Sequence, residues 1–163
     1  TTFALSAYIG MTRSEINEYM LPFVAKVIEP MINTLALKII HDHGDSGDTI
    51  LLASATNELI VQPIAKRLDI QNVIGTQVKF INDKCTGEYI PPSALGEGKL
   101  QLVQQWMQKN NFDDFSGVTF YSDSINDLPL LEAVDFPKAV NPDAMLEKIS
   151  LERGWEIIDL PIL

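Results

Sequence analysis

The sequence predicts an α/β fold: a doubly wound, mostly parallel sheet of the Rossmann-like type, with a helical segment at its N-terminal end. Three observations predict this class. Short β-branched apolar runs alternate with helical segments after Gly47, the residues before it have helical periodicity, and 163 residues with 46% hydrophobic and 21% charged side chains suit a globular protein. Strands alternating with helices of this length imply right-handed βαβ crossovers and therefore parallel strands.

The first helix is predicted to begin after Thr12, because Thr12 and Glu15 have the spacing of a capping box. Its apolar face consists of Ile16, Tyr19, Met20 and Phe23. Pro30 suits the first turn of a second helix. The apolar side of that helix consists of Ile32, Leu35, Ile39 and Ile40. A turn at His43–Asp48 ends this helical part.

The remainder of the chain is predicted to form strands and helices in alternation. Strands are expected at 49–54, 73–74, 117–123, 136–140 and 155–160, and helices at 57–68, 99–109, 126–134 and 142–153. The run 77–90 predicts a hairpin with its turn at Asn82 and Asp83, residues that tolerate the backbone of a tight turn.

The charge balance excludes several classes of partner. Twelve Lys and Arg stand against 22 Asp and Glu, a formal net charge of −10, and no basic stripe is present. Such a surface repels nucleic acids and anionic membranes. The longest apolar stretch, 20–40, contains charged residues and two prolines, which indicates packed helices and not a membrane span. The single cysteine, Cys85, fits a reducing cytoplasm.

Two polar strand ends are candidate ligand sites, because ligands of parallel sheets bind beyond the carboxyl ends of the strands. At Ser54-Ala55-Thr56-Asn57 a strand leads directly into a helix, and a hydroxyl beside helical N–H groups can bind an anion. Thr56 or Asn57 could equally serve only as a helix cap. Both interpretations remain open for this motif.

The second strand end, Ser122-Asp123-Ser124-Ile125-Asn126-Asp127, places two carboxylates four residues apart. Carboxylate oxygens suit Mg²⁺, which commonly takes one or two carboxylates plus water and substrate phosphate. The alternative is a capped turn with solvated acids. Asp127 stands just before an apolar helix, where two clustered acids would repel each other unless a positive group lay near them.

Gly96-Glu97-Gly98-Lys99 is a third, weaker candidate. The glycines permit close backbone approach, but the motif lacks the second half of a nucleotide-binding GxxxxGK[ST] loop. A lysine at a helix start is poorly placed with respect to the helix dipole, which indicates a counter-charge nearby.

These motifs, in this order, resemble the haloacid dehalogenase-type hydrolases, in particular their phosphoserine-phosphatase-like branch of subfamily IB type. The resemblance covers about residues 30–163 and rests on LLASATNELIVQPIA, GEGKLQLVQQWM, YSDSINDLPLLEAV and AVNPDAMLEKISLERGW. It implies a Mg²⁺-dependent phosphomonoesterase that acts on a small phosphorylated metabolite through an aspartyl-phosphate. Carried over residue by residue, it implies these catalytic residues: Ser54, Lys99, Asp123 and Asp127. It also implies that substrate contacts come from Ser54, Ala55, Lys99 and Asn126, and that Asp123 and Asp127 form the metal site.

One motif of that family is absent from the sequence. The family's first strand ends in D-x-D, which carries the nucleophile and the acid/base, and no two aspartates here are separated by a single residue. We therefore expect residues 1–29 to be an incomplete helical cap segment and residues 30–163 to be a core without its first strand. We expect the nucleophile upstream, and no activity from this chain alone.

The chain also departs from the family pattern at two motifs. SATN stands where Ser-Gly-Gly is usual, and SDSIND stands where Gly-Asp-Gly-x-Asn-Asp is usual, so phosphoserine does not follow as the substrate. A fragment or degenerate relative that holds phosphate or metal without turnover is the alternative function. A receiver-like signalling domain also clusters acids on a parallel sheet, but it explains neither the hairpin nor the helical N-terminal part.

Overall fold

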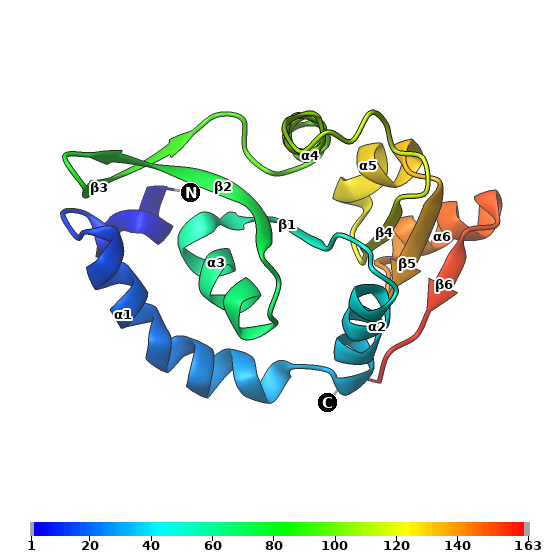
Figure 1. Cartoon of the computed structure of the whole chain (residues 1–163), viewed down its shortest axis with the longest axis horizontal. Helices are drawn as coiled ribbons and strands as arrows, with labels where there is room; N and C mark the ends of the chain where they lie inside the picture. Colours follow the sequence, from blue (N-terminus) through cyan, green and yellow to red (C-terminus); the bar gives the residue numbers. More distant parts are fainter. Residues whose placement is uncertain (1, 162–163) are drawn as a thin grey trace. The chain divides into compact units, whose positions relative to one another are not determined.

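The computed structural model describes residues 2–161 and divides into two compact units, one up to Ala94 and the other from Leu95 onward (Figure 1). Each unit contains one three-stranded sheet within the described residues. The predicted division between residues 29 and 30 stays a prediction.

The first unit begins with helices. A 3₁₀ helix, Thr2–Tyr8, precedes α1, Arg13–Phe23, and the predicted capping box is present: Glu15 N–H donates to the Thr12 hydroxyl, and Thr12 N–H donates to the Glu15 carboxylate at 2.7 Å. A π-helical turn, Val24–Ile28, follows directly. None of the helices in the described range combines the length and hydrophobicity that spanning a bilayer requires.

The prediction that Pro30 opens the second helix is wrong. Pro30 lies in a separate 3₁₀ turn, Glu29–Met31, and α2, Thr34–Asp45, begins after Asn33. The Asn33 side chain accepts the N–H groups of Leu35 and Ala36, a stronger start signal than a proline in the first turn. Helix α2 also extends into the predicted turn at His43–Asp48.

The first sheet has the order β1-β2-β3, and its elements are β1, Leu51–Asn57, α3, Glu58–Arg67, β2, Asn72–Ile81, and β3, Lys84–Ile90. Strand β2 pairs in parallel with β1 through its first half and antiparallel with β3 through its second half. The strand at 73–74 and the first arm of the hairpin are thus one strand. The predicted turn is confirmed, since Asn82 and Asp83 have φ angles of 49° and 61°.

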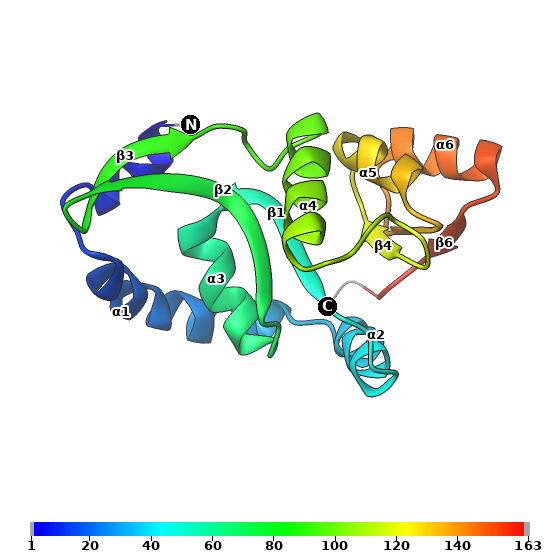
Figure 2. The same cartoon turned by 45° about the horizontal axis from the view of Figure 1, so that its top comes forward.

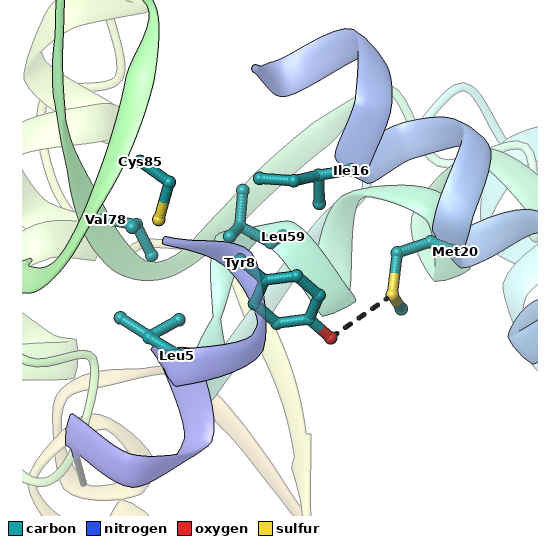
Figure 3. Packing of buried hydrophobic residues seen from close by; sticks show 7 residues of the cluster. All are labelled: Leu5, Tyr8, Ile16, Met20, Leu59, Val78 and Cys85. Carbon is teal, nitrogen blue, oxygen red and sulfur yellow. Dashed lines mark hydrogen bonds between the residues drawn. The ribbon is translucent and has the colours of Figure 1, made fainter. Parts of the chain in front are cut away.

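An apolar cluster packs α1 and α3 against the β2–β3 hairpin in the first unit. Helix α3 lies between β2 and α1 (Figures 1 and 2), and its side chains meet those of four other elements in this cluster. Figure 3 shows the cluster, which consists of Leu5, Tyr8, Ile16, Met20, Leu59, Val78 and Cys85. The buried Tyr8 hydroxyl donates to the Met20 sulfur at 3.7 Å, and burial, together with Tyr19, raises the Tyr8 pKa.

The second unit is a parallel α/β arrangement with strand order β4-β5-β6. Its elements are α4, Glu97–Lys109, β4, Thr119–Ser122, α5, Leu128–Ala133, β5, Phe136–Val140, α6, Ala144–Arg153, and β6, Glu156–Ile158; a 3₁₀ turn, Ile125–Asp127, precedes α5. Its core consists of Leu131, Ala139 and Leu146, with Trp155 among the side chains packed against them.

The predicted α/β class is confirmed, and parallel pairing predominates as expected. The expected single sheet is not present within the described residues, which form two sheets instead. Strand β1 is an edge of the first sheet and β4 is an edge of the second, so each leaves one side of its backbone without a partner strand in residues 2–161.

Ser150 in α6 is fully buried, and its hydroxyl has no hydrogen-bond partner among the described residues. We expect Ser150→Ala to maintain or raise the free energy of unfolding, by up to about 1 kcal/mol, because alanine removes a desolvated hydroxyl that gains no hydrogen bond. Urea denaturation measures this free energy. A loss larger than about 1 kcal/mol would show that the hydroxyl is bonded in solution.

Candidate active site

A buried ion pair lies at the end of β4 in the second unit. The Lys99 ammonium Nζ is 2.5 Å from Asp127 Oδ1, and the Ser122 hydroxyl donates to Asp127 Oδ2 at 2.6 Å. All three residues are buried: Lys99 is 5% exposed, Asp127 is 7% exposed and Ser122 is 8% exposed. Both oxygens of the Asp127 carboxylate therefore have a partner within the protein, which is the condition for keeping a charge away from water.

The start of α4 places Lys99 at this carboxylate. Gly96 precedes the helix with φ 55° and ψ −128°, a backbone conformation that only glycine adopts readily. A Cβ atom at Gly96 would lie 3.7 Å from the carbonyl oxygen of Asn126, so the glycine loop runs beside the turn that leads to Asp127. Lys99 lies in the first turn of α4, and Asp127 supplies the counter-charge expected from its unfavourable position in the helix dipole.

Asp123 and Asn126 lie on the loop between β4 and α5, and both are exposed. The backbone of this loop is well fixed: the Ser122 hydroxyl accepts the Ser124 N–H, and the Asp123 carbonyl accepts the Asp143 N–H at 2.8 Å. The Asp123 carboxylate itself makes no hydrogen bond or ion pair with the described residues. It is thus an unpaired carboxylate on a loop whose backbone is hydrogen-bonded on both sides of it.

Asp143 is a residue of this region that the motifs did not single out. Its Oδ2 accepts the Ile125 N–H at 2.7 Å, while its Oδ1 accepts the first N–H groups of α6, from Met145 and Leu146. The bond from Ile125 is the main cause that lowers the Asp143 pKa, and the bond from Leu146 adds to it. The signal in the sequence was an aspartate directly before a helix, the usual N-cap pattern.

Ser54 and Ala55 belong to the first unit and lie within β1, which continues three residues beyond the predicted strand end at Ser54, to Asn57. Ser54 is half-buried and its hydroxyl accepts the Thr56 N–H at 3.2 Å, while Ala55 is exposed. Asn57 occupies the N-cap position of α3, but its side chain makes no capping bond, and its buried Oδ1 has no partner among residues 2–161. Side-chain capping therefore does not explain these polar residues.

Strand β2 packs closely against the last residues of β1, residues 54–57. A Cβ atom at Gly75 would lie 3.0 Å from the Glu58 nitrogen and from the Thr56 carbonyl oxygen, so only glycine lets β2 approach this closely. The buried Thr76 hydroxyl donates to the Ala55 carbonyl at 2.9 Å and accepts the Ala94 N–H at 3.0 Å. Neither residue was predicted from the sequence, because their role depends on tertiary contacts.

The carboxylates at the end of β4 fit a Mg²⁺ site that has very few protein ligands. Among residues 2–161, no group of three or more His, Cys, Asp and Glu side chains lies close enough together to hold a metal ion. Asp123 offers a free carboxylate, whereas both Asp127 oxygens already bind Lys99 and Ser122. Mg²⁺ commonly binds through one or two carboxylates, with water and substrate phosphate completing its shell, so this arrangement is compatible with it.

Comparison with known proteins identifies the family. The family model of haloacid dehalogenase-like hydrolases matches residues 2–132. The chain belongs to the haloacid dehalogenase-like hydrolase family. Within this family it falls in the phosphoserine phosphatase-like branch, which confirms the resemblance seen in the motifs.

Three relatives illustrate this similarity. A histidinol-phosphatase of Neisseria meningitidis serogroup C (strain 8013) is 38% identical over 160 residues, which are 96% of this chain and 72% of that protein. The phosphoserine phosphatase SerB1 of Mycobacterium tuberculosis (strain ATCC 25618 / H37Rv) is 35% identical over 120 residues, 74% of this chain and 39% of that protein. The crystal structure of a Bordetella pertussis Tohama I protein of unknown function is similar with a TM-score of 0.88 and 33% identity, over 98% of this chain and 73% of that one.

The buried pair generates a prediction about stability. We expect Asp127→Asn to lower the free energy of unfolding by about 3 kcal/mol, because it leaves the Lys99 ammonium buried without a counter-charge. The matched control is Asp42→Asn, which breaks the exposed Lys38–Asp42 pair and should cost less than about 1 kcal/mol. Urea denaturation of both variants checks this, and equal losses would contradict it.

The lowered Asp143 pKa generates a prediction about pH. A carboxylate with a folded-state pKa below its unfolded value of about 3.9 stabilises the protein above that pH. This stability is lost as the pH falls through the lower folded-state pKa. We expect the stability of Asp143→Asn to fall less steeply with acid than that of the wild type. Some slope remains, because a bond from Thr12 also lowers the Glu15 pKa. Thermal unfolding between pH 5 and about pH 2 measures this, and identical slopes would contradict it.

Proposed function

We propose that the full-length protein is a Mg²⁺-dependent phosphatase that hydrolyses a small phosphomonoester through an aspartyl-phosphate. Family membership supports hydrolysis of a phosphate ester. The observation that carries the proposal is the buried Lys99–Asp127 pair, together with the exposed carboxylate of Asp123 four residues before Asp127 on the same segment. The transition state of phosphoryl transfer carries negative charge on several oxygens. The fixed ammonium of Lys99 can stabilise this charge, and the unpaired carboxylate of Asp123 can hold a metal cation that does the same.

Each candidate residue has a proposed role in binding the phosphate or the metal ion. Lys99 holds a phosphate oxygen, because its ammonium is fixed in place by Asp127. Ser54, with the backbone at Ala55, binds phosphate through its hydroxyl and the N–H groups near the start of α3, and Asn126 contacts the substrate from its exposed position. Asp123 would hold Mg²⁺, and Asp127 supports that site. When bound, Mg²⁺ supplies charge neutralisation at the phosphate oxygens.

The nucleophile is proposed to be an aspartate outside these 163 residues, on the first strand of the family's sheet. Its carboxylate oxygen attacks phosphorus, the bond to the ester oxygen breaks, and the leaving alcohol takes a proton; water then hydrolyses the acyl phosphate to release inorganic phosphate. The absence of D-x-D from the sequence supports this assignment. The unpartnered edges of β1 and β4 also support it, because a further strand on each edge would satisfy exposed backbone groups.

The substrate is proposed only as a class, a small phosphorylated metabolite. The Neisseria relative is named a histidinol-phosphatase and the Mycobacterium relative a phosphoserine phosphatase, so the branch accommodates different alcohols. A cytoplasmic location is part of the same proposal and rests on the single buried cysteine. Because no D-x-D motif is present, a binding fragment without turnover is the second candidate.

Asp123→Asn in the full-length product tests this function. We expect the rate of p-nitrophenyl phosphate hydrolysis with Mg²⁺ to fall by about 100-fold or more, because the variant loses the anionic metal ligand. EDTA should abolish the wild-type activity, and excess Mg²⁺ should restore it. The exposed Asp45→Asn variant on α2 is the matched control and should keep wild-type kcat.

Two results would overturn parts of the proposal. Full activity of Asp123→Asn would remove Asp123 from the metal site. Turnover by residues 1–163 alone would remove the requirement for an upstream aspartate. Binding of phosphate or Mg²⁺ by a full-length protein without turnover would favour the second candidate.

A further inference from the structure

We propose that Ser122 is a positioning residue of this phosphatase: its hydroxyl orients the Asp127 carboxylate toward Lys99 and holds the loop that carries Asp123. The inference rests on the proposed function and assigns a role to a residue that the motif contains but to which the family resemblance gives no role. Ser122 is the last residue of β4, the point at which the parallel strand ends and the polar loop begins.

The first step concerns hydrogen bonds. A serine hydroxyl has one hydrogen to donate and two lone pairs to accept with. Ser122 donates to Asp127 Oδ2 at 2.6 Å and accepts the Ser124 N–H at 3.2 Å. One buried hydroxyl therefore contacts both the carboxylate of Asp127 and the backbone immediately after Asp123.

The second step concerns the freedom of the carboxylate. The terminal torsion of an aspartate is broad and roughly two-fold, so a single contact at Oδ1 would leave the plane of the group poorly determined. The bond from Ser122 holds Oδ2 while Lys99 holds Oδ1. Because Asp127 is almost completely buried, loss of the hydroxyl would also leave Oδ2 without its protein partner in a site shielded from water.

The third step concerns the lysine. An ammonium on a flexible four-carbon stem has no preferred direction of its own. The position of Lys99 Nζ is therefore determined by the carboxylate that it contacts, and the orientation of that carboxylate is determined in turn by Ser122. The usual family motif has glycine at the place of Ser122, so the hydroxyl is a feature of this chain beyond the family pattern.

The experiment compares Ser122→Ala with Ser122→Thr in the full-length protein, using p-nitrophenyl phosphate and Mg²⁺. We expect Ser122→Ala to lower kcat by about 10- to 100-fold with little change in KM, and Ser122→Thr, which keeps the hydroxyl, to stay within a few-fold of the wild type. Ser150→Ala is the matched control, since it removes another buried hydroxyl, one without a partner among the described residues.

A double variant separates positioning from a merely structural effect. In the Asp127→Asn background, Ser122→Ala should cause almost no further loss of kcat, because the group through which Ser122 acts has already been changed. Losses that simply multiply would overturn the inference. If Ser122→Ala does not fold, Ser122→Gly, which carries the residue usual in the family, replaces it, and wild-type kcat in that variant would overturn the inference too.

A binding measurement distinguishes failure of this inference from failure of the proposed function. An active wild type whose Ser122→Ala variant has the same kcat overturns the role of Ser122 and leaves the phosphatase function intact. A wild type without turnover overturns the function. In that case, calorimetric titration with inorganic phosphate tests the role of Ser122 separately from turnover. Weaker phosphate binding by Ser122→Ala than by Ser150→Ala supports the positioning role, and equal binding overturns it.

Discussion

The burial of the Lys99 ammonium is the constraint on which the arrangement of the second unit depends. A cation removed from water is tolerated only where a carboxylate meets it at close range and where that carboxylate is itself hydrogen-bonded. Three local features meet this requirement. Gly96 lets α4 begin beside the turn at Asn126, the end of β4 delivers the Ser122 hydroxyl, and the 3₁₀ turn before α5 delivers Asp127. The pair thus joins a helix start, a strand end and a loop.

The sequence was sufficient to predict the order of the elements and the α/β class, because periodicity and turn residues are local signals. It was insufficient where two local signals compete for the same helix start, and where the pairing of strands determines how far a strand extends. Pro30 and Asn33 both suit a helix start, and Asn33 prevails because its side chain accepts two N–H groups. The sequence predicts two separate strands within 72–81. In the structure this run is one strand whose partner changes midway from the parallel β1 to the antiparallel β3, and such pairing does not follow from local sequence.

The candidate site shows the same limit at the level of single residues. The poor dipole position of Lys99 correctly indicated a counter-charge, because a helix dipole follows from sequence position alone. Which acid would provide it did not follow from the sequence, and Asp127 was assigned to the metal site. The role of Ser122 was not predicted, and Asp143 and Gly75 were not identified, because their contacts join residues that the fold alone brings together.

The change of partner along β2 has a mechanical consequence for the first unit. The last residue paired with β1 is Thr76, and the next residue, Gln77, is already paired with β3. The Thr76 hydroxyl bonds the Ala55 carbonyl on one side and the Ala94 N–H on the other. The hairpin and the segment paired with β1 therefore share one continuous strand without an intervening loop, and a displacement of the hairpin would reach the end of β1 through this strand. We therefore expect the hairpin and the end of β1 to be displaced together.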